Sequence, residues 1–199
     1  AIVFDDADLD EAVAGAMASK FRNMGQTCVC SNRFLVQDGV YDAFAAKLQH
    51  AIAQLKLGSG FEADTTQGPL IDRNALDKVE RLVSDAVHKG AQVLTGGQPS
   101  SLGGTYYEPT LLLNVTSPMH IAQEEVFGPV APLFRFQTEA QAVAMANDTE
   151  FGLAAYFYAR DIGRVWRVSG QLQYGMVGIN SGVISTAVAP FGGVKQSGQ

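Results

Sequence analysis

The stretch LAAYFYARDIGRVWRVSGQLQYGMVGIN, residues 153–180, places two apolar segments on either side of a more polar one. Residues 153–159 are rich in aromatic and small apolar side chains and predict a strand, and residues 175–180 predict another. Asp161, between them, is a residue type that begins helices. Two strands joined through one helix pair in parallel, because a parallel connection needs a crossover of about a dozen residues or more. The stretch therefore predicts an α/β fold.

The same alternation extends over the rest of the chain. Helices are predicted after the capping residues Asp8, Asp38 and Asp72, each followed by apolar residues at helical spacing, and over residues 139–146. Further strands are predicted at residues 32–37, 92–95, 109–113 and 130–136. The fold class that follows is α/β, a three-layer αβα domain with a mostly parallel sheet. Residues 1–199 are expected to form one unit, without an internal repeat or linker.

The composition excludes several classes of function. Of 199 residues, 47% are hydrophobic and 17% are charged, and the formal net charge is -6. A negative chain without a basic stripe repels polyanions, so no nucleic-acid partner is expected. Apolar runs stay well below the roughly 18 residues of a membrane span, and the start does not resemble a secretion signal. We therefore expect no membrane contact and a cytoplasmic location.

Both cysteines lie in FRNMGQTCVCSN, residues 21–32. Two cysteines cannot build a disulfide framework, and the three histidines are too distant for metal-ligand spacing, so no metal is expected. The thiols are then either small buried apolar side chains or reactive groups. The preceding residues 25–27, Gly-Gln-Thr, let the chain turn sharply away from the helix. This favours Cys28 as a nucleophile on a loop above the sheet.

The residues around Cys28 resemble the active-site cysteine signature of the aldehyde dehydrogenase superfamily. The signature is FRNMGQTC, residues 21–28, and two further segments match the same family in the expected order: EEVFGP, residues 124–129, and PFGGVKQSG, residues 190–198. GPLID, residues 68–72, and NDTEFGLAAY, from residue 147, are also similar to it. The resemblance covers essentially the whole chain and implies the catalytic domain of this family.

The resemblance implies a covalent mechanism. Cys28 would attack an aldehyde carbonyl to give a hemithioacetal, which passes hydride to NAD or NADP and leaves a thioester for water to cleave. In the family, the backbone N–H of this cysteine helps to stabilise the oxyanion. Glu125 and Phe127 match the positions that hold the nicotinamide half of the cofactor, the carboxylate on the ribose and the ring near the nicotinamide. On an extended stretch, side chains at i and i+2 would point to one side.

In sequence detail, these motifs are most similar to the succinate-semialdehyde dehydrogenase branch of the family. In that branch the arginine at position 22 and the serine at position 185 bind the distal carboxylate of the substrate, and Phe191 is assigned to the same pocket. A guanidinium gives bidentate, charge-assisted hydrogen bonds to a carboxylate, which fits this role of Arg22. The expected partner is a small aldehyde with a distal carboxylate. Glutarate semialdehyde remains an alternative, since one methylene is worth only about 1 to 3 kcal/mol.

Cys30 has two interpretations, a buried thiol that points away from Cys28 or a resolving thiol. Oxidant could link Cys28 to Cys30, which would protect the nucleophile while switching activity off. The bond in so small a ring would be readily reduced. A non-catalytic α/β module that senses oxidants through this pair is the alternative function. Glu125, Phe127 and Arg22 favour the enzyme, because a redox sensor needs neither ribose nor carboxylate contacts.

The resemblance also indicates what the chain would lack. In the family, the dinucleotide-binding half and the general-base glutamate precede the region that these residues match, and a C-terminal tail that helps to form oligomers follows it. We therefore expect a fragment of an enzyme that is a homo-oligomer, with little or no dehydrogenase activity of its own. The choice between NAD and NADP is not visible, because the residues that would read the 2′-phosphate are in the missing half.

Overall fold

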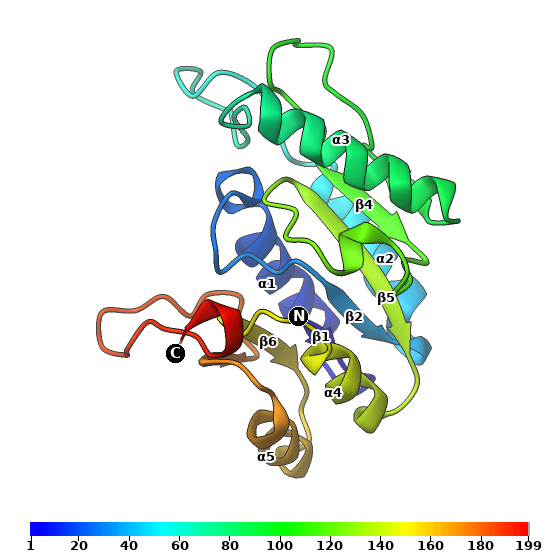
Figure 1. Cartoon of the computed structure of the whole chain (residues 1–199), viewed down its shortest axis with the longest axis vertical. Coiled ribbons are helices and arrows are strands. Elements are labelled where there is room, and N and C mark those ends of the chain that lie inside the picture. The colour runs from blue at the N-terminus through cyan, green and yellow to red at the C-terminus, as the bar shows by residue number, and fades with distance from the viewer. Residues whose placement is uncertain (199) are drawn as a thin grey trace.

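The computed structural model describes residues 1–198. The predicted unit extends to Gln199, which lies outside these residues. The helices are α1 (Leu9–Lys20), α2 (Tyr41–Ile52), α3 (Arg73–His88), α4 (Glu139–Asn147) and α5 (Ile162–Gln171), and the strands are β1 (Ile2–Val3), β2 (Phe34–Gln37), β3 (Gln92–Thr95), β4 (Thr110–Leu113), β5 (Val130–Phe136), β6 (Ala154–Tyr158) and β7 (Met176–Ile179). Figure 1 shows their arrangement.

Within residues 1–198 the strands form one sheet of seven in the order β3-β4-β5-β2-β1-β6-β7. Every neighbouring pair is parallel except β3 and β4, which run antiparallel at one edge. The stretch of residues 153–180 supplies β6, α5 and β7, and its two strands pair in parallel as predicted. The α/β class and the mostly parallel sheet are confirmed.

Two separate apolar cores show that helices cover both faces of the sheet. One core joins α1 and α2 to one face, and the other joins α3, α4 and α5 to the opposite face. Strand β2 shows the alternation that this arrangement requires, because Phe34 and Val36 belong to the first core and Leu35 to the second. In Figure 1, α2 lies behind the sheet. The predicted three layers are therefore present.

Strand β1 lies near the centre of the sheet, although the sequence did not predict it. Ile2 pairs with Leu35 of β2 and with Phe157 of β6, and Val3 pairs with the next residue of each strand. Both side chains are buried. Two residues are too few for a periodic pattern, so only the pairing of distant strands identifies this element.

Three of the four predicted capping aspartates cap their helices. Asp8, Asp72 and Asp161 each accept a hydrogen bond from a backbone N–H in the first turn. The prediction for Asp38 is wrong. Asp38 begins a short 3-10 turn before α2, and its carboxylate accepts from Arg135 of β5 at 2.9 Å. The ion pair with a neighbouring strand has replaced the local cap.

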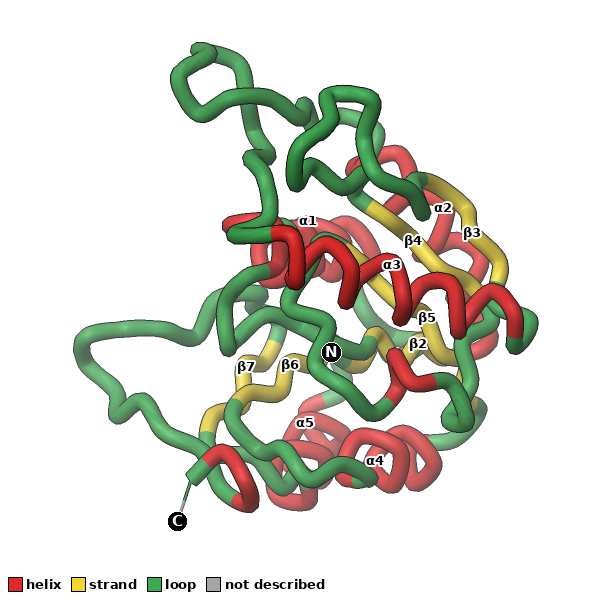
Figure 2. The backbone as a smooth tube through the Cα atoms, turned by 45° about the horizontal axis from the view of Figure 1, so that its top comes forward, coloured by secondary structure: helices red, strands yellow, loops and turns green. Residues whose placement is uncertain are grey.

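Loops extend the domain at two places. Residues 181–194 run as a long loop that begins just after β7 (Figure 2). The segment around residue 70 meets the segment around residue 105 through hydrogen bonds from Leu70 N and from Thr105 Oγ1. None of the helices within residues 1–198 is long and apolar enough to cross a bilayer.

Candidate active site

The chain reverses its course between α1 and Cys28. Asn23, Met24 and Gly25 have φ angles of 50°, 57° and 75°, three consecutive residues in the left-handed region. This conformation is costly for a residue with a side chain, and burial of Met24 in the core offsets part of the cost. A tight turn follows, closed by the Cys30 N–H, which donates to Thr27 O at 3.0 Å. Cys28 is therefore at the tip of a turn, as predicted for a loop.

Gly25 makes the closest contact between the two motifs. A Cβ atom at this position would lie 2.2 Å from the carbonyl oxygen of Gly128, in EEVFGP. No real side chain allows this approach, so both the positive φ and the contact require glycine. The loop of Cys28 and the loop of Glu125 are thus packed backbone to backbone, about a hundred residues apart in the chain.

Two glutamines hold the base of the cysteine loop against the GPLID segment. The Gln26 side chain accepts from the Ile71 N–H at 2.9 Å. Gln67 is buried and donates to the carbonyl oxygen of Phe21, also at 2.9 Å. These two hydrogen bonds fix the base of the turn against this neighbouring segment.

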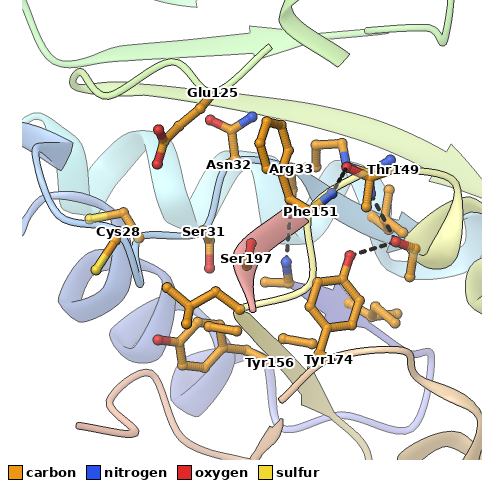
Figure 3. A pocket seen from close by; sticks show the side chains of 18 of the residues that line it. Cys28, Ser31, Asn32, Arg33, Glu125, Thr149, Phe151, Tyr156, Tyr174 and Ser197 are labelled. Atoms are coloured by element: carbon orange, nitrogen blue, oxygen red, sulfur yellow. Dashed lines mark hydrogen bonds between the residues drawn. The ribbon is translucent and has the colours of Figure 1, made fainter. Parts of the chain in front are cut away.

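A cavity of about 380 Å³ lies beside the turn. Figure 3 shows the Glu125 carboxylate pointing from the upper wall toward the side on which Cys28 lies, with Asn32 beside it. Ser197, from PFGGVKQSG, contributes another part of the wall and accepts from the Gly152 N–H at 3.1 Å. The cavity lies at the amino ends of β1, β2 and β6, since residues at or just before the start of each strand line it.

Cys28 and Cys30 are both free thiols, but their surroundings differ. Cys28 is exposed, and within residues 1–198 its backbone N–H has no hydrogen-bond acceptor. Cys30 is half-buried, with Sγ at 2.6 Å from Thr27 Oγ1 and 3.9 Å from the carbonyl oxygen of Lys20. The two cysteines occupy a turn, so strand alternation does not relate their side chains.

Lys20 is a buried charge beside this site that sequence reasoning missed. Its side chain is at the end of α1 and the residue is 1% exposed. Burial lowers the pKa of the ammonium from 10.5 to about 8, although the charges of Cys30 and Glu125 act in the opposite direction. A lysine at a helix end usually reaches solvent, and only the tertiary fold reveals that this one does not.

Arg22 and Ser185 lie on the wall of one narrow crevice, and both are exposed. Both residues line it, together with Val29 and Tyr156. Tyr156 also lines the larger cavity that contains Cys28, so one side chain separates the two spaces. Its hydroxyl donates to Val29 O at 2.8 Å. Burial, aided by the negative charge of Cys30, raises the pKa of Tyr156 to about 12, so the phenol stays protonated and can donate.

Two of the predicted site residues lie elsewhere. Phe127 has a φ of 51°, so it does not continue an extended stretch from Glu125, and within residues 1–198 it is not part of the wall of either space. Phe191 is 55% exposed on the loop of residues 181–194 and lines neither space. The expectation that Glu125 and Phe127 point to one side by strand alternation is therefore wrong. No group of three His, Cys, Asp or Glu side chains suited to a metal occurs in the same residues.

Comparison with known proteins matches the whole chain to the family that its motifs resemble. The model of the "Aldehyde dehydrogenase family" matches residues 1–199. A glutarate-semialdehyde dehydrogenase of Pseudomonas aeruginosa is 63% identical over 99% of the chain and 41% of that protein. A 3-sulfolactaldehyde dehydrogenase of Pseudomonas putida is 64% identical over 99% of the chain and 40% of that protein.

Solved structures agree in three dimensions. The crystal structure of a succinate-semialdehyde dehydrogenase from Burkholderia pseudomallei has a TM-score of 0.99 and 63% identity, and the match covers 100% of this chain and 41% of that one. The turn places exposed Cys28 on a cavity that the carboxylate of Glu125 also lines. This arrangement on an open α/β fold defines a candidate site for covalent catalysis. The chain belongs to the aldehyde dehydrogenase family, whose members use NAD or NADP, and it spans about two fifths of the length of these relatives.

Gly25→Ala should destabilise the protein strongly. The new methyl group would combine a left-handed backbone with a backbone clash at Gly128, so the free energy of unfolding should fall by more than about 1 kcal/mol. Urea unfolding followed by circular dichroism measures this. Gly60→Ala is the matched control, because a Cβ there meets nothing within 4 Å. Equal stability of the two variants would contradict the proposed contact.

Lys20→Met should stabilise the protein at neutral pH. With a pKa of about 8 in the folded state and 10.5 in the unfolded state, Lys20 binds protons more tightly when the chain unfolds. Its burial therefore costs up to about 3 kcal/mol below pH 8, and stability returns as the pH rises from 8 to 10.5. The advantage of Lys20→Met should shrink over this range.

Denaturant unfolding at several pH values, with the exposed Lys47→Met as control, tests this prediction. Lys47→Met should show no such trend. A Lys20→Met advantage that stays constant from pH 7 to 10.5 would show that the lysine is not buried as a destabilised cation.

Proposed function

We propose that this chain is the catalytic region of an NAD(P)-dependent dehydrogenase that oxidises an aldehyde with a carboxylate at its far end, with succinate semialdehyde as the first candidate. The observation that carries the proposal is the pair of spaces that share Tyr156. Exposed Cys28 is among the residues that line one of them, and Arg22 and Ser185, both exposed, are among those that line the other. An aldehyde and an anionic group are recognised by these two kinds of side chain.

The names of the relatives support an anionic substrate. Glutarate semialdehyde, succinate semialdehyde and 3-sulfolactaldehyde are the compounds in the names of the three relatives described above. Each of these compounds is an aldehyde with a carboxylate or sulfonate elsewhere in the molecule. A planar, bidentate cation is suited to both acids, so the position of Arg22 is compatible with the whole group.

The chemistry assigned to this chain centres on Cys28. Its thiolate forms a carbon–sulfur bond with the aldehyde carbon, and the carbonyl electron pair moves to oxygen to give a hemithioacetal. The unpartnered N–H of Cys28 can donate to that oxyanion. When bound, NAD or NADP supplies the acceptor for the hydride that leaves the carbon. Water then cleaves the resulting thioester and releases the Cys28 thiolate with the acid.

The wall of the larger cavity fits the nicotinamide half of the cofactor. Glu125 is exposed to the cavity, and within residues 1–198 its carboxylate makes no hydrogen bond, so both oxygens are available to accept from ribose hydroxyls. Aliphatic side chains such as Ile2 and Leu35 line the same space and offer an apolar surface to a flat ring. Phe127 and Phe191 stay predictions for the cofactor and the substrate, respectively.

The resolving-thiol role of Cys30 stays a prediction as well. The contact of its sulfur with Thr27 holds it in place beside the turn, and forming a disulfide would require that contact to break. Treatment of the full-length protein with peroxide, followed by mass measurement with and without reductant, tests the role. Loss of activity without a mass deficit of two hydrogens would rule out the resolving role of Cys30. In that case, Cys30→Ser should lose activity to peroxide as readily as the unmodified protein.

Arg22→Lys in the full-length protein should separate substrates by their charge. Loss of the bidentate contact should lower kcat/KM for succinate semialdehyde by about 10- to 100-fold, because hydrogen bonds to charged groups are worth about 1.5 to 3 kcal/mol. Butanal, which lacks the carboxylate, should be affected much less. Steady-state kinetics with both aldehydes measures the difference.

Arg73→Lys is the control, because Arg73 is an exposed residue of α3 paired with Asp77. Arg73→Lys should leave kcat/KM unchanged for both succinate semialdehyde and butanal. An equal loss for succinate semialdehyde and butanal in Arg22→Lys would contradict the assignment of the distal carboxylate to Arg22. Comparison of succinate and glutarate semialdehydes in the unmodified protein decides between the two chain lengths.

A further inference from the structure

One side chain ties the cysteine segment to the peptide groups on both sides of Glu125. Asn32 lies four residues after Cys28 and two residues before the start of β2. Its Nδ2 donates to the carbonyl oxygen of Glu124 at 2.9 Å, and its Oδ1 accepts from the backbone N–H of Val126 at 2.8 Å. Figure 3 shows Asn32 beside Glu125 on the same wall of the cavity.

The two partners fix the orientation of the carboxamide. A carbonyl oxygen can only accept and a backbone N–H can only donate, so Nδ2 must face Glu124 and Oδ1 must face Val126. Aspartate has the same shape but cannot donate to Glu124. Serine is too short to reach both groups, and alanine reaches neither.

Glu125 depends on this support because, within residues 1–198, its own side chain makes no hydrogen bond or ion pair. The loop that carries it has no regular secondary structure, and two residues later Phe127 adopts a φ of 51°. The outer end of the loop is held separately, since the Glu124 carboxylate accepts two hydrogen bonds from Arg81. Within residues 1–198, Asn32 is the only side chain that hydrogen-bonds to the peptide groups on either side of Glu125.

We propose that Asn32 is a positioning residue for the dinucleotide half of the site: its carboxamide holds Glu125 at a fixed place relative to Cys28, so that the carboxylate is preorganised for ribose hydroxyls. The proposal rests on the proposed function. Because Cys28 and Asn32 belong to one short segment, the same element sets the nucleophile and the cofactor contact. Preorganisation of this kind lowers the entropic cost of binding and shows as tighter binding.

The test uses Asn32→Asp and Asn32→Ala in the full-length protein, with Asn147→Ala as the matched control. Asn147 makes the same pair of bonds elsewhere, donating to Gln171 O and accepting from the Gln173 N–H, both at 2.9 Å. Calorimetric titration with NAD and with NADP gives Kd, and thermal unfolding gives Tm. Hydrogen exchange at the Val126 amide reports the bond directly.

We expect both Asn32 variants to raise the dinucleotide Kd at least tenfold and to speed exchange of the Val126 amide. Asn147→Ala should lower Tm by a similar amount while Kd is unchanged. Glu125→Gln should also weaken binding, and adding Asn32→Ala to it should weaken binding little further, because the asparagine acts through the carboxylate. Additive losses would overturn the positioning role and leave only a general effect on folding.

The outcomes separate the inference from the proposed function. If the unmodified full-length protein binds neither NAD nor NADP, the proposed function fails and the role of Asn32 fails with it. If it binds one of them and the Asn32 variants bind equally well, the function stands and the inference is wrong. Should Asn32→Asp fail to fold, Asn32→Ala gives the same readouts.

Discussion

The contact between the backbones of Gly25 and Gly128 is the constraint on which the site depends. It sets the distance between a loop that carries a thiol and a loop that carries a carboxylate, and it tolerates no side chain on Gly25. The three left-handed residues before Gln26 direct the chain into this contact, and the two bonds of Asn32 secure it again on the other side of Cys28. The turn of Cys28 and the loop of Glu125 therefore both contribute to the wall of the cavity.

The site gathers cations in a protein with a net charge of -6. Lys20 is buried under the cysteine loop and Arg22 lines the neighbouring crevice. A guanidinium favours the anionic end of the proposed substrate. The stability cost of burying Lys20 is understandable if the charge serves the site, since functional sites commonly carry groups that a purely structural core would replace.

Local patterns in the sequence predicted most of the fold. Strands such as β5 and helices such as α3 contain several apolar residues at one period, and the pattern does not need the rest of the chain. Strand β1 has no such pattern, and Asp38 was misread because an arginine from β5 competes for its carboxylate. Cys28 as nucleophile, and Arg22 and Ser185 as carboxylate-binding residues, were predicted from motifs that resemble a family, and these roles stay predictions.

Asn32, Lys20 and Tyr156 were missed for a different reason. Asn32 and Tyr156 act through hydrogen-bond partners that are distant in sequence, and Lys20 is notable because it is buried. A short stretch of sequence reveals neither long-range partners nor burial. Phe127 shows the opposite case, where a regular spacing predicted an orientation that a positive φ abolishes. Spacing predicts direction only where the backbone is regular.

The most direct measurement of the central claim is peptide mass mapping of the full-length protein, quenched with acid during turnover of succinate semialdehyde with NAD or NADP. The proposed function predicts a succinyl group on the peptide that contains Cys28, attached to that residue, with Cys30 unmodified. A succinyl group on Cys30, or turnover that persists in Cys28→Ala, would contradict it.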